Sequence, residues 1–237
     1  MRFALSTAAV VALISLLAGA ASARQDADDH YCAKSGAIRF RAADGTRLAG
    51  HRFGRGTTAV VFAHEVLGGA CRWIPYARQL ARLGYLTIAF DFRGYGSSQR
   101  RRGTAGLRLP SDVIAAAKKS RALGATKVVL VGASMGGTAV LVAAARADPA
   151  IDGVIALSAP QAFGRMDGIV AARRLQTPIL YVAGDKDDGF ADDARMLYEA
   201  TTSSDKRLEI LDTSAHGILL ASQPAARSLI ESFIASR

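Results

Sequence analysis

Apolar and polar positions alternate in blocks along most of the chain. Short, continuously apolar runs are typical of strands that are covered on both faces. Such strands are predicted at 58–64, 85–90, 127–131, 152–158 and 178–184, with a further strand at 207–211. Helical spacing of apolar residues between them predicts helices near 73–83, 111–123, 138–148, 192–200 and from about 222 onward. Ser111 is expected to cap the second of these helices, and Pro149 to end the third.

Two shorter runs precede these blocks and alternate strictly between apolar and polar residues. They span Ala37–Arg41 and Arg47–Phe53, and Asp44-Gly45 lies between them. Asp-Gly between alternating runs predicts a β-hairpin. A hairpin followed by regular strand–helix alternation predicts an α/β fold with a mostly parallel sheet and helices on both faces. Residues 37–237 are therefore interpreted as one domain, and the link 159–177 leaves room for at most one short helix and no large cap.

The first 23 residues have the pattern of a secretory signal peptide. Arg2 precedes an apolar stretch from Ala8 to Ala20, and Ala21-Ser-Ala23 fits a small-residue cleavage site. The stretch is shorter than the roughly 20 residues of a membrane span, so cleavage near Ala23 is expected, and an uncleaved anchor is the alternative. The mature protein would be exported, periplasmic or secreted, with a loose polar segment at 24–36 and no membrane span.

Charge and cysteine content change this picture only a little. The formal net charge is +10, which suits an anionic partner such as an envelope surface, but no nucleic-acid motif accompanies it. The densest basic run, Arg100–Arg102, is interpreted as a solvated loop. In an exported chain, the two cysteines Cys32 and Cys71 are expected to form a disulfide, with two free thiols as the alternative. Closing that loop of about 40 residues would stabilise the fold by about 4 kcal/mol.

The strongest chemical signal follows the strand that begins at Lys127. Gly132-Ala-Ser134-Met-Gly136-Gly137 places a serine between glycines and before a helix of small residues. This strand–turn–helix is the pattern of a nucleophile elbow, in which glycines allow a turn too tight for Cβ atoms. A glycine turn without catalytic function is the alternative. Ser134 is the candidate nucleophile.

A serine nucleophile needs a base and an orienting carboxylate, both at the carboxyl ends of strands. His30 lies in the loose start, His51 lies inside the hairpin, and His64 precedes the serine, whereas His216 follows the last strand. The order serine, acid, histidine is that expected after an elbow, so His216 is the candidate base. The acid is sought after strand 178–184, where Asp187 is preferred over Asp185 and Asp188.

Taken together, these motifs resemble the α/β-hydrolases, in their minimal capless form, over the whole mature chain. The resemblance rests on Gly132–Gly137, Asp91-Phe-Arg-Gly-Tyr-Gly96-Ser97, Gly184-Asp-Lys-Asp187 and His216-Gly217. It implies an eight-stranded sheet whose second strand is antiparallel, and a Ser134–His216–Asp187 triad that needs no metal or organic cofactor.

One departure from the commonest pattern of the family concerns Glu65. Many members have His-Gly after the third strand, whereas this chain has His64-Glu65-Val66, which resembles the dienelactone hydrolase branch. That branch implies that the N–H groups of Val66 and Met135 form the oxyanion hole. Its nucleophile is a cysteine, and the serine here argues against true dienelactone hydrolase activity. Glu65 is expected to brace its loop, with an interaction with Ser134 as the alternative.

The function expected from the sequence is an exported serine hydrolase that cleaves small-molecule carboxylic esters through an acyl-enzyme. Lactone or dienelactone hydrolysis and thioester hydrolysis are alternatives, because the same triad supports them. A non-catalytic envelope-binding protein on the same fold is the alternative of another class. The sequence does not indicate the natural acyl group or the oligomeric state.

Overall fold

The computed structural model describes residues 36–99 and 108–237 and arranges them around one eight-stranded sheet. Its strands are β1 (Ala37–Arg41), β2 (Arg47–Phe53), β3 (Thr58–Ala63), β4 (Leu86–Phe90), β5 (Lys127–Ala133), β6 (Gly153–Leu157), β9 (Ile179–Gly184) and β10 (Lys206–Leu211). Their order is β1-β2-β4-β3-β5-β6-β9-β10. Strand β2 is antiparallel to both of its neighbours, and the other pairs are parallel. The predicted hairpin and mostly parallel sheet are confirmed.

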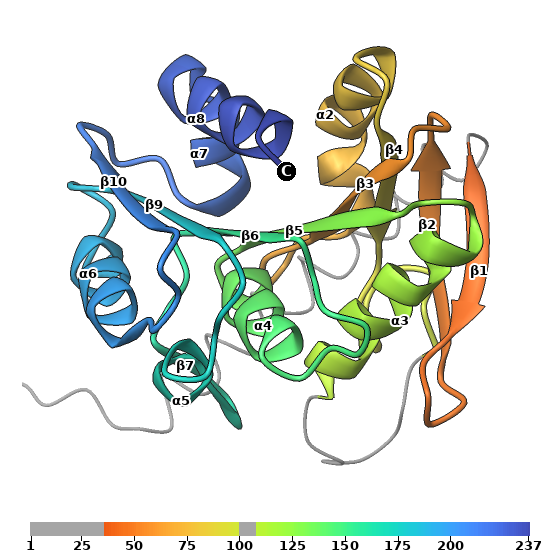
Figure 1. Cartoon of the computed structure of the whole chain (residues 1–237), viewed down its shortest axis with the longest axis horizontal. Coiled ribbons are helices and arrows are strands. Elements are labelled where there is room, and N and C mark those ends of the chain that lie inside the picture. Colours follow the sequence, from red (N-terminus) through yellow and green to blue (C-terminus); the bar gives the residue numbers. More distant parts are fainter. Residues whose placement is uncertain (1–35, 100–107) are drawn as a thin grey trace, which may run out of the picture.

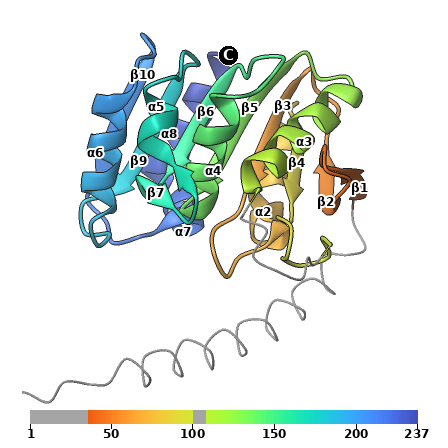
Figure 2. The same cartoon turned by 90° about the horizontal axis from the view of Figure 1, so that it is seen from below.

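Helices cover both faces of this sheet (Figure 1). One face carries α2 (Ala70–Arg82), α7 (Gly217–Ser222) and α8 (Pro224–Ala235). The other carries α3 (Leu109–Ala122), α4 (Met135–Ala144), α5 (Gly168–Ala172) and α6 (Phe190–Ala200). Seen at right angles, α7 and α2 both lie at the lower edge of the fold (Figure 2).

Strand β3 shows why the central runs are continuously apolar. Ala59, Val61 and Ala63 pack into the core on the α3–α4 side, whereas Val60 and Phe62 pack into the core on the α2–α8 side. Successive side chains of a strand point to opposite faces, so burial on both faces requires an apolar residue at every position. The same two-sided burial fixes the register, because a slip of one residue would exchange the faces.

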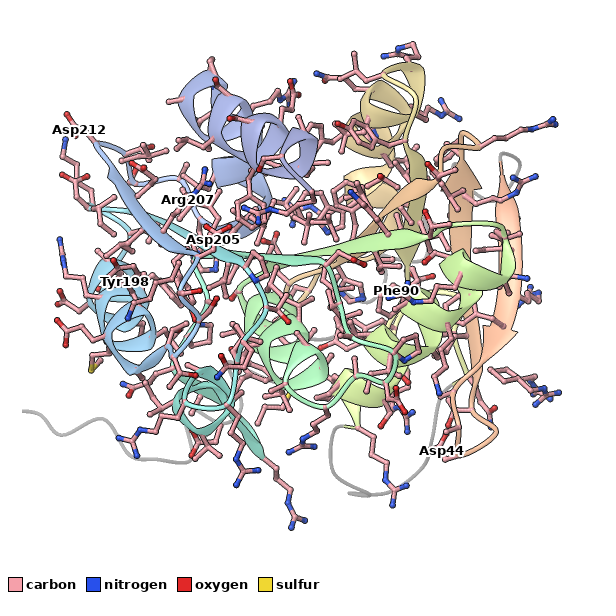
Figure 3. All side chains as sticks on the ribbon, in the orientation of Figure 1. Asp44, Phe90, Tyr198, Asp205, Arg207 and Asp212 are labelled. Atoms are coloured by element: carbon pink, nitrogen blue, oxygen red, sulfur yellow. The ribbon has the colours of Figure 1, made fainter. Side chains whose placement is uncertain are left out.

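A buried ion-pair network holds the hairpin against the rest of the sheet. Arg93, just after β4, is 2.6 Å from the carboxylate of Asp112 in α3 and 2.8 Å from that of Asp44 in the β1–β2 turn. The Arg93 guanidinium holds the pKa of Asp44 well below its usual range. Asp44 lies at the tip of the hairpin, and Phe90 lies between the sheet and α3 (Figure 3).

Two sequence-based helix boundaries are wrong, and one short helix was not predicted. Helix α3 begins at Leu109 with Arg108 as its N-cap, so Ser111 lies inside the first turn, where Pro110 is tolerated. Helix α4 ends at Ala144, well before Pro149, because its last turn tightens into bonds such as Arg146 N–H to Ala143. Helix α7 was not predicted as an element separate from α8.

The link between β6 and β9 contains the expected single short helix, α5. It also contains a small hairpin of two-residue strands, β7 (Ala162–Phe163) and β8 (Met166–Asp167). No large cap covers the sheet in the described residues, as predicted.

Several predictions fall outside the described residues: the signal peptide at 1–23, nearly all of the loose segment, Cys32 and the basic run 100–102. Cys71, in the first turn of α2, is not a free cysteine. The Cys32–Cys71 disulfide stays a prediction. Among the helices of residues 36–99 and 108–237, none has the length and apolar character that crossing a membrane requires.

Candidate active site

Ser134 occupies a strained turn between β5 and α4. Its backbone has φ 50° and ψ −118°, a combination that a non-glycine residue rarely adopts. Its N–H donates to the carbonyl of Leu157 at 2.8 Å, which anchors the turn to β6. A Cβ on Gly132 would collide with the backbone of Gly136, and a Cβ on Gly136 would collide with the carbonyl of Ala63. The predicted elbow geometry is therefore present at Ser134.

His216 and Asp187 lie together, as the sequence predicts. Nδ1 of His216 is 2.9 and 3.0 Å from the two carboxylate oxygens of Asp187, and a carboxylate can only accept, so Nδ1 carries the proton. Asp187 is buried, whereas the His216 side chain is 33% exposed. The ring of Phe190 packs on the imidazole with centroids 4.4 Å apart. The hydrogen bonds with Asp187 fix the tautomer of His216, and the contact with Phe190 helps to fix the tilt of its ring.

The neighbouring carboxylates, Asp185 and Asp188, do not face His216. Asp185 is exposed and accepts a hydrogen bond from the N–H of Thr213 at 3.0 Å, which shapes the loop between β10 and His216. Asp188 is exposed. Of the three candidates after β9, only Asp187 contacts the histidine.

The structure brings Ser134 and His216 into adjoining segments without a hydrogen bond between them. Gly217, next to His216, is packed so closely that its Cβ would lie 3.4 Å from that of Ala133, next to Ser134. In the described part of the chain, neither the Ser134 hydroxyl nor Nε2 of His216 has a hydrogen-bond partner. Catalytic hydrogen bonds are often long in ligand-free structures and shorten when substrate binds.

The two predicted oxyanion donors lie on the segments that flank the elbow. Met135 is the first residue of α4, and Val66 lies in a turn closed by a 3.1 Å hydrogen bond from Gly68 N–H to the Glu65 carbonyl. Leu67, in the same turn, has φ 58°. Among the described residues, no hydrogen bond occupies the N–H of Val66 or of Met135.

His64 has a structural part that sequence reasoning missed. It is fully buried, and its Nε2 accepts from Phe92 N–H at 3.1 Å while its Nδ1–H donates to the Glu65 carbonyl at 2.8 Å. Burial lowers the pKa of His64 to about 4, so the ring is neutral. The side chain thereby fixes the backbone from which the Val66 turn starts. Its position at the end of a buried strand was the only signal in the sequence.

Asp91 was likewise missed as an anchor of this edge, although it directly follows β4. Its carboxylate accepts from Ala70 N–H at 2.7 Å, in the first turn of α2, and from Ser97 N–H at 3.1 Å. Burial raises the pKa of Asp91. The two bonds hold the start of α2 close to the end of β4.

Comparison with known proteins identifies this architecture. Residues 58–174 match a family model described as alpha/beta hydrolase fold. An esterase of Pyrococcus furiosus superposes with a TM-score of 0.73 at 18% identity, over 84% of this chain and 91% of that one. The chain has the α/β-hydrolase fold.

Other solved structures with this fold differ in the activity that their names give. A monoacylglycerol lipase of Paleococcus ferrophilus has a TM-score of 0.67 at 20% identity, over 80% of this chain and 99% of that one. An enol-lactonase of Burkholderia xenovorans LB400 has a TM-score of 0.68 at 16% identity, over 83% and 98%. No curated protein sequence matches this chain. Identities this low establish the fold alone.

In the α/β-hydrolase fold the nucleophile is expected at the turn where Ser134 lies, with its partners after later strands. Within the described residues, no group of three or more His, Cys, Asp or Glu side chains could hold a metal ion. Apolar side chains are exposed on the turn after β3 and on α7, namely Val66, Leu67 and Leu219.

Proposed function

We propose that this protein is a serine hydrolase that cleaves carboxylic esters through an acyl-enzyme. The observation that carries the proposal is the Asp187–His216 pair on the segment packed against the strained Ser134 turn. A surface histidine in a loop has no need of a buried carboxylate, whereas a general base does.

The chemistry follows from the roles of these groups. Nε2 of His216 takes the Ser134 proton as the hydroxyl attacks the ester carbonyl, and Asp187 stabilises the imidazolium that forms. The N–H groups of Val66 and Met135 donate to the oxyanion; loss of one such donor typically raises a barrier by about 3–4 kcal/mol. His216 then protonates the leaving alcohol. In the second half, water gives a proton to His216 and attacks the acyl carbon, the bond to the Ser134 oxygen breaks, and that oxygen takes the proton from His216 as the acid leaves. No step needs a metal or organic cofactor.

Esters are preferred as substrates because this triad chemistry suits them and an esterase of Pyrococcus furiosus shares the fold. The link between β6 and β9 adds only α5 and the β7–β8 hairpin and therefore no large cap. Lactone hydrolysis is the second candidate, favoured by Glu65 after β3, as in the dienelactone hydrolase branch, and by the enol-lactonase neighbour.

The proposal also includes export of the mature protein. The signal-peptide pattern of residues 1–23 supports cleavage near Ala23 and delivery to the periplasm or the medium. Cys71, which is not free, supports a disulfide to Cys32 in that oxidising environment.

Labelling with a fluorophosphonate probe tests the nucleophile directly. The wild-type mature protein is expected to be labelled, and Ser134→Ala is expected to lose both labelling and about 10⁴-fold or more in kcat on a short-chain aryl ester. An unlabelled wild type, or equal labelling of the variant, would show that the protein is not a serine hydrolase and favour a binding role. A parallel panel of a lactone, a thioester and an ester then ranks the substrate classes.

A further inference from the structure

We propose that the Glu65 side chain is a positioning residue that connects the oxyanion turn to the helix carrying His216, and so sets the base against the oxyanion donors. The proposal rests on the serine-hydrolase function proposed above and assigns Glu65 no contact with the reacting atoms.

Both carboxylate oxygens of Glu65 have partners on other elements. Oε2 accepts the N–H of Ile218, in the first turn of α7, at 2.9 Å, and Oε1 lies 2.6 Å from the guanidinium of Arg72 in α2. The Glu65 side chain is 10% exposed, whereas that of Arg72 is 39% exposed. Because both oxygens are engaged in this way, Glu65 is arranged as a hydrogen-bond acceptor for α7 and not as a base for Ser134.

Helix α7 carries the histidine directly. His216 is its N-cap residue, and the His216 carbonyl accepts the N–H of Leu219 at 3.0 Å, so a shift of α7 shifts the imidazole. A helix of this length leaves its first N–H groups without partners inside the helix. Ser158 accepts from Gly217 N–H at 3.1 Å, and Glu65 accepts from Ile218 N–H.

The fit between Glu65 and α7 is close. A Cβ on Gly217 would collide with Oε2 of Glu65, and Gly217 also has φ 54°. The glycine after the histidine therefore allows the carboxylate to approach the helix backbone. The Glu65 side chain thus links the turn that contains Val66, the proposed oxyanion donor, to Ile218, two residues after the proposed base His216.

The backbone and side chain of Glu65 can be tested separately. The Glu65 carbonyl accepts from His64 Nδ1–H and Gly68 N–H, and these bonds do not involve the carboxylate. Truncation of the side chain leaves the oxyanion turn anchored and removes the contacts with α7 and with Arg72. An amide at the same position still offers an oxygen to Ile218 N–H, whereas it loses the charge that faces Arg72.

The experiment compares Glu65→Ala, Glu65→Gln and a matched control, Asp152→Ala. Asp152 makes the same kind of contacts near the opposite end of β5, because it accepts Val128 N–H at 2.8 Å and lies 3.6 Å from Arg121. Misplacement of a catalytic group by about 1 Å can cost about 100-fold. We expect Glu65→Ala to lower kcat by about 10- to 100-fold with KM changed by less than about 3-fold. We expect Glu65→Gln and Asp152→Ala to keep kcat within about 3-fold of wild type.

Either of two results would overturn the proposal: wild-type kcat in Glu65→Ala, or a kcat in folded Glu65→Gln as low as in Glu65→Ala. Fluorophosphonate labelling of the wild type separates this failure from that of the proposed function. If the wild type is not labelled, the hydrolase assignment fails; if the wild type and Glu65→Ala are labelled at the same rate, only the role of Glu65 fails.

Gly217→Ala supplies a second test, in which its effect is measured both in the wild type and in Glu65→Ala. The added Cβ pushes against the Glu65 carboxylate, so the substitution is expected to lower kcat in the wild-type background. It is expected to cost several-fold less where residue 65 is alanine, because the collision is gone. Equal fold-losses in the two backgrounds would show that Glu65 and α7 are not coupled, and would also overturn the proposal.

Discussion

The carboxyl edge of the sheet presents two histidines, one after β3 and one after β10, in opposite surroundings. His64 is fully buried, and both of its ring nitrogens bond to backbone groups, the Glu65 carbonyl and the Phe92 N–H. His216 has a partly exposed ring, one nitrogen on the Asp187 carboxylate, and a second nitrogen that has no partner in the described chain.

These partners decide what each ring can do with a proton. The Phe92 N–H is fixed and can only donate, so a proton on Nε2 of His64 would face a second donor in a fully buried site. Asp187 can stabilise an imidazolium on His216, and the open nitrogen can reach a substrate. A histidine near a nucleophile is therefore identified by its two nitrogen partners and not by its distance alone.

The two regions are also joined to each other. Glu65 follows His64 in sequence and accepts a hydrogen bond from Ile218, two residues after His216. The connection through Glu65 therefore begins next to the buried His64 and ends two residues after His216.

Exchanging each histidine for glutamine would break the comparison most strongly. His216→Gln removes the base and is expected to lower kcat by about 10⁴-fold or more, with the free energy of unfolding changed by less than about 1 kcal/mol. His64→Gln leaves a buried N–H or carbonyl poorly paired and is expected to cost about 1–3 kcal/mol of stability, with a far smaller loss of kcat per folded molecule than in His216→Gln. Ester-hydrolysis kinetics and urea unfolding of both variants check this. Loss of kcat to the same degree in folded His64→Gln would contradict the assignment.

Substitutions of the aspartates after β9 test whether the Asp187–His216 hydrogen bond distinguishes His216 from His64. Asp187→Asn lets Nδ1 of His216 face an amide donor, which favours the wrong tautomer, and is expected to lower kcat by about 10³-fold or more. Asp185→Asn is the matched control, because its amide oxygen can still accept from Thr213 N–H, and it is expected to keep kcat within about 3-fold. Steady-state kinetics of the two variants make the measurement. Equal losses would mean that the loop and not the Asp187–His216 bond matters.

The sequence predicted the framework of this edge because local patterns determine it. Strands buried on both faces appear as continuous apolar runs. Gly132 is required by the close approach of β5 to α4, and Gly136 by the close approach of α4 to the end of β3. Of the three aspartates after β9, the preferred Asp187 is the one whose buried carboxylate contacts His216.

What the sequence could not predict depends on contacts between distant segments. Glu65 and Ile218 are separated by 153 positions, and no local pattern indicates their hydrogen bond. The same holds for His64, whose partner, the Phe92 N–H, lies just after β4, the strand next to β3. Ser111 was chosen as a cap by residue type, but the helix begins earlier with Pro110 in its first turn.

The acid stability of the protein provides the smallest and most specific test of the comparison. The pKa of His64 falls from the ordinary value of 6.5 to about 4 in the folded protein. Between these two pH values, His64 is protonated in the unfolded chain but not in the folded protein. The stability that depends on His64 is therefore fully present above pH 6.5 and is lost as the pH falls toward 4. From pH 7.5 to pH 5 the loss due to His64 is about 2 kcal/mol. Urea unfolding of wild type and His64→Gln at both pH values measures it, and the difference between the proteins removes the shared titration of other groups. If the two proteins lose the same stability, the ring of His64 is not held neutral by its burial, and the contrast with His216 fails.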